Sequence, residues 1–286
     1  GIAYASLLQG LEVLLIDQNI KAAEAGKAKI EMLLSESVKR KKLSEEEKIR
    51  LLEKVKTASS LEIISSSDLV IEAVFEDLNL KHNLYKKIEP HLKEGAILAS
   101  NTSTLPITKL SEVLADSTRF LGIHFFSPVD KMNLVELIKS ERTNDNALAV
   151  ALDYTSLIKK TPIVVNDSRG FYANRCIIPY INEGLRMLNE GIEPALIENS
   201  AKQIGMPVGP LQLLDELSVS LALNVAKETK EALGTKYEET GTESILLEMS
   251  QKNRLGRKEL AGFYEYDEKG RRLKLWEGLR NLNIEK

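Results

Sequence analysis

The sequence lacks the features that mark several specialised classes of protein. Its 286 residues include one cysteine, Cys176, which excludes an internal disulfide framework and lies in an apolar run that predicts a buried helix position. No apolar run approaches the ~18 residues of a membrane span, and there is no signal-peptide pattern. The net charge of -3 argues against nucleic acid or a membrane surface as the main partner. We therefore expect a cytoplasmic protein with one large domain or two.

The start of the sequence lacks two parts of a dinucleotide-binding βαβ unit. Residues 1–10 predict a helix without an N-cap, residues 11–16 predict an apolar strand, and Asp17 is the acid that closes that strand. In a complete unit, a strand and a Gly-x-Gly-x-x-Gly turn precede such a helix. Since the sequence also begins without methionine, we interpret it as truncated. The missing strand would be central, so we expect its neighbours to keep unpaired edges.

Asp17 has two interpretations. An acid at a strand end is ordinarily a solvated carboxylate, whereas in a βαβ context it hydrogen-bonds the adenosine ribose of a dinucleotide. We favour the second role for Asp17. A carboxylate there would repel a 2′-phosphate, so the expected cofactor is NAD and not NADP.

Strand-like and helix-like segments alternate as far as residue 165, which predicts an α/β fold with a doubly wound sheet. The predicted strands are residues 11–16, 69–76, 96–100, 121–126, 134–138 and 162–165. The predicted helices are residues 22–37, 79–92 and 147–159. Ser44 and Glu47 form a capping-box pattern at the start of a further helix.

Beyond Gly170 the strands almost vanish, and the sequence predicts an all-helical C-terminal domain. Its predicted helices are residues 172–188, 194–203, 211–229 and 242–253. A short hairpin is expected about residues 267–270. We place the two domains at residues 1–168 and 169–286.

The segment on either side of Asp130 holds the most informative pair of residues. His124 lies in one apolar, strand-like run, and Glu136 lies in the next. If the two strands fold back antiparallel about Asp130, positions 124 and 136 face each other. A histidine whose ring is held by a buried carboxylate is a general base with its tautomer fixed. The alternative is a core histidine beside a solvated glutamate.

Five ordered motifs resemble the 3-hydroxyacyl-CoA dehydrogenase family, and the resemblance covers essentially the whole chain. The motifs are Asn-Thr-Ser-Thr-Leu-Pro-Ile from Asn101, Gly-Ile-His-Phe-Phe-Ser-Pro-Val from Gly122, Asn-Asp-Ser-Arg-Gly-Phe-Tyr-Ala-Asn-Arg from Asn166, Gly-Met-Pro-Val-Gly-Pro from Gly205, and Gly-Arg-Lys from Gly256 leading to Gly-Phe-Tyr. The sequence Leu-Trp-Glu-Gly-Leu from Leu275 is similar to the bacterial multifunctional fatty-acid oxidation proteins.

The resemblance implies an NAD-binding Rossmann-type domain followed by a helical domain for substrate binding and dimerisation. It implies NAD-dependent oxidation of (3S)-3-hydroxyacyl-CoA to 3-ketoacyl-CoA in fatty-acid β-oxidation. His124 would remove the hydroxyl proton, and Glu136 would orient the ring and stabilise the imidazolium. Ser103 and Asn174 would hydrogen-bond the reacting oxygen or the thioester carbonyl, with Asn174 contributed from the second domain.

The resemblance also implies residues that bind the cofactor and the CoA. Ala73, Glu76 and Ser103 would lie along the cofactor, with Lys81 reaching towards the nicotinamide side. Ser127 would contact the cofactor at a position where the family commonly has asparagine. The basic residues 39–42 are either a solvated helix face or a site for the CoA phosphates. We assign no metal ligands.

Other functions compete with this one. A short-chain 3-hydroxybutyryl-CoA dehydrogenase is the nearest alternative, and a non-catalytic binding or dimerisation module is the alternative from another class. The expected partners are the acyl-CoA substrate and either a second copy of the chain or other domains of a multifunctional β-oxidation protein. Nucleic acid and a membrane span are not expected.

Overall fold

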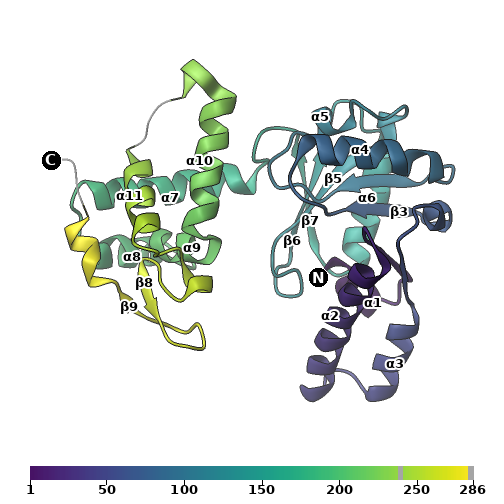
Figure 1. Ribbon diagram of the computed structural model, residues 1–286, viewed down its shortest axis with the longest axis horizontal. Helices are drawn as coiled ribbons and strands as arrows, with labels where there is room; N and C mark the ends of the chain where they lie inside the picture. Colours follow the sequence, from purple (N-terminus) through teal and green to yellow (C-terminus); the bar gives the residue numbers. More distant parts are fainter. Residues whose placement is uncertain (238–240, 283–286) are drawn as a thin grey trace. The chain divides into compact units, whose positions relative to one another are not determined.

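The computed structural model describes residues 1–237 and 241–282 (Figure 1). The chain divides into two compact units, unit 1 at Gly1–Ala173 and unit 2 at Asn174–Lys286. The division falls a few residues beyond the expected boundary near residue 168.

Unit 1 contains a five-stranded sheet and a separate two-stranded sheet. The larger sheet has the order β3 (Leu69–Glu72), β4 (Ile97–Ser100), β5 (Phe120–Phe125), β6 (Leu134–Lys139) and β7 (Thr161–Asn166). Its strands pair in parallel except for β5 and β6, which are antiparallel. The smaller sheet pairs β1 (Val13–Ile16) with β2 (Val55–Ala58) in parallel. The α/β fold with a largely parallel sheet is confirmed.

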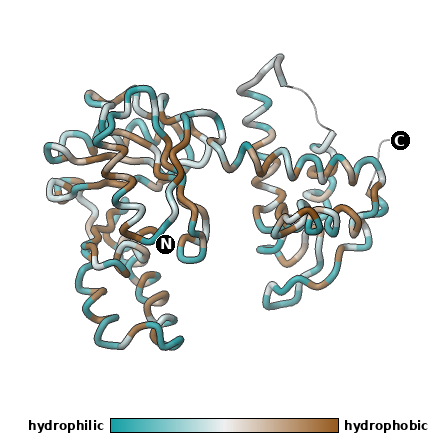
Figure 2. Tube along the Cα trace, turned by 180° about the vertical axis from the view of Figure 1, so that it is seen from behind, coloured by the Kyte–Doolittle hydropathy of each residue, from teal (hydrophilic) through white to brown (hydrophobic). Residues whose placement is uncertain are grey.

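Helices cover both faces of the larger sheet because its strands alternate their apolar side chains. Ile97 and Ala99 point to the face covered by α6 (Asp145–Leu157), whereas Leu98 points to the opposite face. That opposite face is covered by α4 (Leu78–Ile88) and α5 (Ile107–Ser111) (Figure 1). Figure 2 shows the strands as mainly hydrophobic. Burial on both faces explains the near-continuous apolar runs in the sequence.

The remaining helices of unit 1 pack beside the small sheet. They are α1 (Ile2–Leu8), α2 (Ile20–Lys39) and α3 (Glu45–Glu53). The predicted capping box of α3 is confirmed: the Glu47 N–H donates to the Ser44 hydroxyl, and the Ser44 N–H donates to the Glu47 carboxylate. α2 and α3 lie side by side as the predicted helical pair (Figure 1).

The prediction of a strand over residues 69–76 is wrong in its second half. β3 ends at Glu72, because the Glu72 carboxylate turns back and accepts a hydrogen bond from the Val74 N–H at 2.7 Å. α4 then begins after Asp77, whose side chain caps its N-terminus. The other predicted strands agree with the structure to within about two residues, while β2 was not predicted.

Unit 2 is built of helices and one hairpin. The helices are α7 (Ala173–Asn189), α8 (Pro194–Gln203), α9 (Pro210–Leu217), α10 (Val219–Leu233) and α11 (Thr242–Gln251). The predicted hairpin is formed by β8 (Tyr264–Tyr266) and β9 (Arg272–Leu275). Within the described residues, short 3-10 helices lie in unit 1 at Glu62–Ser66, Glu89–His91 and Ser117–Arg119, and in unit 2 at Gly234–Lys236, Arg257–Glu259 and Glu277–Asn281.

Two predictions for unit 2 are wrong. Residues 211–229 do not form one helix, because the chain breaks at Ser218, which has a φ of 93°. The Ser218 side chain caps α10, and the Val219 N–H donates to the Leu255 carbonyl instead of continuing α9. Cys176 is exposed and not buried, since the apolar run around it faces the core with other residues.

Within the part of the chain that the structure describes, no helix is both long enough and apolar enough to span a membrane.

Candidate active site

His124 and Glu136 lie opposite each other on the antiparallel strands β5 and β6, as predicted. The His124 Nδ1 is 2.7 Å from the Glu136 Oε2, and the two side chains are nearly inaccessible to solvent. An ionised carboxylate can only accept a hydrogen bond, so the Nδ1 carries the proton. The Nε2 of the neutral ring is then the nitrogen that can take up a proton.

The second carboxylate oxygen of Glu136 accepts hydrogen bonds that help to keep this side chain ionised. Glu136 Oε1 accepts hydrogen bonds from the Tyr172 N–H at 2.9 Å and from the Ala173 N–H at 2.8 Å. Burial acts to raise the pKa of Glu136, but the hydrogen bonds from His124, Ala173 and Tyr172 outweigh it and hold the pKa below its ordinary value. The carboxylate therefore stays ionised and stabilises a positive charge on the ring.

Aromatic rings enclose the His124 imidazole. The ring centroid of Phe126 is 4.6 Å from that of His124, and the centroid of Phe171 is 5.9 Å away. Phe171 is buried and lies just before the two N–H groups that bind Glu136. These rings restrict the orientation of the imidazole and exclude water from part of it. Neither ring was predicted to be part of the site from the sequence, although both lie within the motifs that resemble the family.

The predicted residue Ser103 lies in the loop that follows β4, and Glu76, which lies between β3 and α4, contacts this loop. Glu76 Oε1 accepts hydrogen bonds from the Thr102 hydroxyl at 2.5 Å, from the Ser103 N–H at 2.8 Å and from the Thr104 N–H at 3.0 Å. The Asn101 side chain accepts from the Phe125 N–H at 2.8 Å, which ties this loop to the end of β5. Glu76 and Ser103 are therefore held in direct contact.

The charge of Glu76 depends on this loop. Burial acts to raise its pKa, but the Thr102 hydrogen bond, the Lys81 charge and the loop N–H groups together lower it. Lys81 is almost completely buried, with its Nζ 2.7 Å from a Glu72 oxygen and 3.4 Å from a Glu76 oxygen. Glu72 was not predicted to be a site residue from the sequence. Its signal was a strand acid followed by a lysine and a tyrosine on one face of the next helix.

The other predicted cofactor residues lie at the carboxyl ends of strands in unit 1. Asp17 follows β1, Ala73 follows β3 and Ser127 follows β5, and all three are exposed. Within the described part of the chain, the Asp17 carboxylate accepts one hydrogen bond, from the neighbouring Gln18 N–H at 2.7 Å. Ligands bind at the carboxyl ends of strands in open α/β sheets, so these side chains are accessible at the appropriate edge.

Two further sets of predicted residues do not lie at these strand ends. Asn174 is the second residue of α7 and belongs to unit 2, so its proposed contact with the substrate stays a prediction. The basic residues 39–42 are exposed at the end of α2 and in the following turn. Arg40 makes a surface ion pair with Glu36 at 3.4 Å, and the binding of CoA phosphates by these residues stays a prediction.

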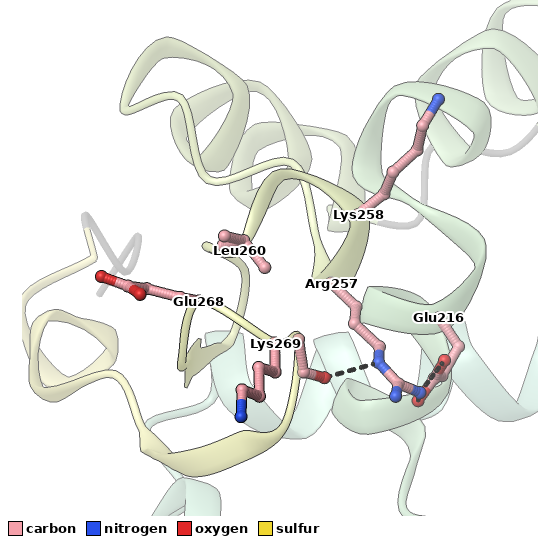
Figure 3. Close-up of a pocket in the computed structure, with 7 residues that line it drawn as sticks. Glu216, Arg257, Lys258, Leu260, Glu268 and Lys269 are labelled. Carbon is pink, nitrogen blue, oxygen red and sulfur yellow. Dashed lines mark hydrogen bonds and ion pairs between the residues drawn. The ribbon is translucent and has the colours of Figure 1, made fainter.

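One hollow lies in unit 2 and contains none of the predicted site residues. It has a volume of about 460 Å³ and is lined by Glu216, Arg257, Lys258, Leu260, Glu268, Lys269 and Gly270 (Figure 3). Arg257 is bound to the Glu216 carboxylate at 2.8 Å and to the Gly270 carbonyl at 2.9 Å. The charged ends of Lys258 and Glu268 point away from each other in Figure 3, so they do not converge on one ligand. Among residues 1–237 and 241–282, no group of acids, histidines and cysteine could hold a metal ion.

Comparison with known proteins gives a consistent result over most of the chain. Residues 1–168 match the family model described as 3-hydroxyacyl-CoA dehydrogenase, NAD binding domain, and residues 170–266 match the model of the C-terminal domain. The structure is similar to (S)-3-hydroxybutyryl-CoA dehydrogenase PaaH1 from Ralstonia eutropha, with 36% identity, a TM-score of 0.85, and coverage of 93% of this chain and 94% of that one. FadB2 from M. tuberculosis has 30% identity, the same TM-score and the same coverage. The dehydrogenase part of multifunctional enzyme 1 from C. elegans has 27% identity and a TM-score of 0.67, and it covers 100% of this chain and 64% of that one.

Proposed function

The chain belongs to the 3-hydroxyacyl-CoA dehydrogenase family, and we propose that this NAD-dependent enzyme oxidises (3S)-3-hydroxyacyl-CoA to 3-ketoacyl-CoA in fatty-acid β-oxidation. The observation that carries the proposal is the buried His124–Glu136 pair. The Nδ1 proton of His124 is hydrogen-bonded to the Glu136 carboxylate, so the Nε2 of His124 is the base that removes the hydroxyl proton at C3. When bound, NAD would supply the acceptor for the hydride that leaves the same carbon.

Glu136 acts on the reaction through His124. Removal of the substrate proton makes an imidazolium, and the ionised carboxylate 2.7 Å away stabilises that charge. The two backbone N–H groups at Tyr172 and Ala173 keep Glu136 in place while the ring changes charge. In the reverse direction the imidazolium donates its Nε2 proton to the ketone oxygen.

Polar groups near the strand ends have the chemistry needed to bind the two ligands. The exposed Asp17 carboxylate would hydrogen-bond the adenosine ribose, and Ala73, Glu76 and Ser127 would lie along the rest of NAD. The buried Lys81 would act on the nicotinamide side through its contact with Glu76. In addition to its cofactor contact, Ser103 would hydrogen-bond the reacting oxygen, and Asn174 would do so from α7.

The test is reduction of acetoacetyl-CoA, followed as the loss of reduced nicotinamide absorbance, for the wild-type protein beside His124→Gln. We expect turnover in the wild type and a loss of about 10²–10⁴-fold in kcat in the variant, since general acid–base catalysis contributes that much. A folded wild type without turnover would remove the catalytic proposal and favour a non-catalytic binding or dimerisation module.

The second candidate is a short-chain 3-hydroxybutyryl-CoA dehydrogenase. It is favoured by the 36% identity to an enzyme that carries this name. A comparison of kcat/KM for acetoacetyl-CoA and for a long-chain 3-ketoacyl-CoA separates the two. Equal or better use of the long chain supports β-oxidation of long fatty acids, whereas a strong preference for the short chain supports the second candidate.

We further propose that the protein works in the cytoplasm, and that unit 2 forms a homodimer or docks on other domains of a multifunctional β-oxidation protein. The similarity to the dehydrogenase part of a multifunctional enzyme supports the docking alternative. Light scattering on the purified protein distinguishes a dimer from a monomer, and cell fractionation checks the location.

A further inference from the structure

Glu72 has an unusual set of hydrogen-bond donors for an acid at the end of a buried strand. Its Oε1 accepts from the Val74 N–H and from the Lys81 ammonium, each at 2.7 Å. Its Oε2 accepts from the Tyr85 hydroxyl at 2.6 Å and from the Ser100 hydroxyl at 2.8 Å. The side chain is almost completely buried. Four donors on one carboxylate fix its position and orientation.

Lys81 and Tyr85 reach Glu72 from the same face of α4. They are one helical turn apart, so both side chains point to the end of β3. Burial and the Glu72 charge raise the pKa of Tyr85, which therefore remains a donor. The Tyr85 ring packs against Phe120 with 5.2 Å between centroids. The anchoring point of the cluster thus lies in the core of unit 1.

The cluster continues from Lys81 to the predicted active-site loop. The Lys81 ammonium lies between the two carboxylates, 2.7 Å from Glu72 and 3.4 Å from Glu76. Glu76 then binds the N–H groups of Ser103 and Thr104. The contacts form an unbroken series from the core residue Tyr85, through Glu72, Lys81 and Glu76, to the backbone of Ser103.

We propose that Glu72 is a positioning residue, which holds Lys81 so that Glu76 stays bound to the backbone of Ser103 and Thr104. The inference rests on the proposed function for its effect on catalysis. Its physical basis is the cost of a buried ammonium, which needs a paired carboxylate. Without the charge of Glu72, Glu76 is the remaining carboxylate near Lys81. Lys81 then draws Glu76 away from the loop, and Ser103 loses its fixed backbone.

Hydrogen exchange tests the structural half of the inference without any ligand. In Glu72→Gln, which keeps the size and most of the hydrogen bonds of the side chain, we expect the Ser103 and Thr104 amides to exchange at least about tenfold faster. Amides of β5 should keep the wild-type rate. Equal acceleration in β5 would show general destabilisation, and unchanged rates at both amides would show that Glu72 does not act on the loop. Either result overturns the proposal.

Kinetics tests the functional half. We expect Glu72→Gln to lower kcat by about 10²-fold, the cost of a small misplacement of an active-site group. If Glu72 acts through Glu76, the double variant Glu72→Gln/Glu76→Gln should be no slower than Glu76→Gln. Multiplied losses in the double variant, or a wild-type kcat in Glu72→Gln, would overturn the positioning role.

Glu198→Gln is the matched control, because Glu198 is also a buried carboxylate that accepts from backbone N–H groups and a tyrosine hydroxyl. It should leave kcat and the exchange at Ser103 unchanged. If Glu72→Gln does not fold, Tyr85→Phe removes one donor from Glu72 while keeping the aromatic ring, and the same exchange pattern is expected with a smaller amplitude. A wild type that shows no turnover contradicts the proposed function, while the exchange data still decide the role of Glu72.

Discussion

The two units bury their carboxylates beside different kinds of partner. In unit 1, Glu136 accepts a hydrogen bond from His124, and Glu72 accepts one from Lys81. Both partners are ionisable side chains. In unit 2, the hydrogen bonds that the buried carboxylates accept come from backbone N–H groups and tyrosine hydroxyls, which keep their protons at every ordinary pH.

The carboxylates of unit 2 fasten the hairpin to the helices. Asp215 accepts from the N–H groups of Phe263 and Tyr264 at 2.8 and 2.9 Å, and from the Tyr266 hydroxyl at 2.9 Å. Glu198 accepts from a backbone N–H at the start of α9 and from the Tyr264 hydroxyl. These contacts join β8 to α8 and α9, and the groups that donate in them keep their protons at ordinary pH.

The difference teaches that burial of an acid does not by itself identify a site. Both kinds of carboxylate satisfy the same requirement, since a buried charge must be hydrogen-bonded. A carboxylate beside a histidine can support proton transfer, whereas one beside backbone N–H groups can only hold structure. The hydrogen-bond partner of a buried carboxylate therefore indicates whether the carboxylate serves catalysis or stability.

The largest expected effect comes from Glu136→Gln. The glutamine oxygen can still accept from the Tyr172 and Ala173 N–H groups, and its amide nitrogen then faces the His124 Nδ1. A donor at that place favours the wrong tautomer of the ring. We expect kcat to fall by about 10²–10⁴-fold with the fold retained. Steady-state kinetics measures the loss, and Glu198→Gln provides the control with unchanged kcat. Equal losses in both variants would remove the distinction between the units.

The sequence was sufficient to predict that His124 faces Glu136, because the register of two neighbouring strands is determined locally. Two apolar runs around a turn can place positions 124 and 136 opposite each other by strand geometry alone, and the observed pairing is His124 with Glu136. Side-chain alternation and capping residues likewise predicted the helical pair and most strand limits. These are local signals.

The features that were missed depend on contacts between distant segments. The role of Glu72 depends on α4 and on Ser100, which lies 28 positions away. The break at Ser218 depends on the hydrogen bond from the Val219 N–H to the Leu255 carbonyl. The spacing of apolar residues within 211–229 does not reveal that contact, so a single helix was predicted. Tertiary hydrogen bonds thus overrode local preference.

The two units should respond in opposite ways to acid. Burial raises the pKa of Asp215 to about 6, against the opposing hydrogen bonds from Phe263, Tyr264 and Tyr266. The folded unit 2 therefore binds more protons than the unfolded chain between about pH 4 and pH 6, and its stability falls by up to about 3 kcal/mol as the pH rises through that window.

In unit 1, the lowered pKa values of Glu76 and Glu136 give the opposite sign. Their contribution is present above the unfolded pKa of about 4.3 and is lost as the pH falls below it. Denaturant unfolding followed by the fluorescence of Trp276, the one tryptophan, reports on unit 2. Hydrogen exchange of β5 reports on unit 1. Asp215→Asn should abolish the pH dependence of unit 2, and persistence of that dependence would contradict the assignment.

A smaller effect is expected when the space beside a carboxylate is filled. A Cβ at Gly262 would overlap the Asp215 carboxylate, which is buried and cannot move aside. Gly262→Ala should lower the free energy of unfolding by about 1–3 kcal/mol. In unit 1, a Cβ at Gly26 would lie 3.6 Å from Leu15 in ordinary contact, and Gly26→Ala within α2 should stabilise by about 0.5–1 kcal/mol. Urea midpoints measure both, and a neutral Gly262→Ala would show that the hairpin has room to shift.

The smallest change removes one tyrosine hydroxyl from each unit. Tyr266→Phe takes a donor from Asp215, and Tyr85→Phe takes one from Glu72, so each should cost about 1 kcal/mol of stability. In both tyrosines, burial and the neighbouring carboxylate raise the pKa, so the wild-type hydroxyls are donors throughout. The two variants should differ in their effect on hydrogen exchange at the Ser103 amide. Exchange at the Ser103 amide should quicken in Tyr85→Phe and stay unchanged in Tyr266→Phe, because the hydroxyl of Tyr85 is connected to that loop through ionisable side chains.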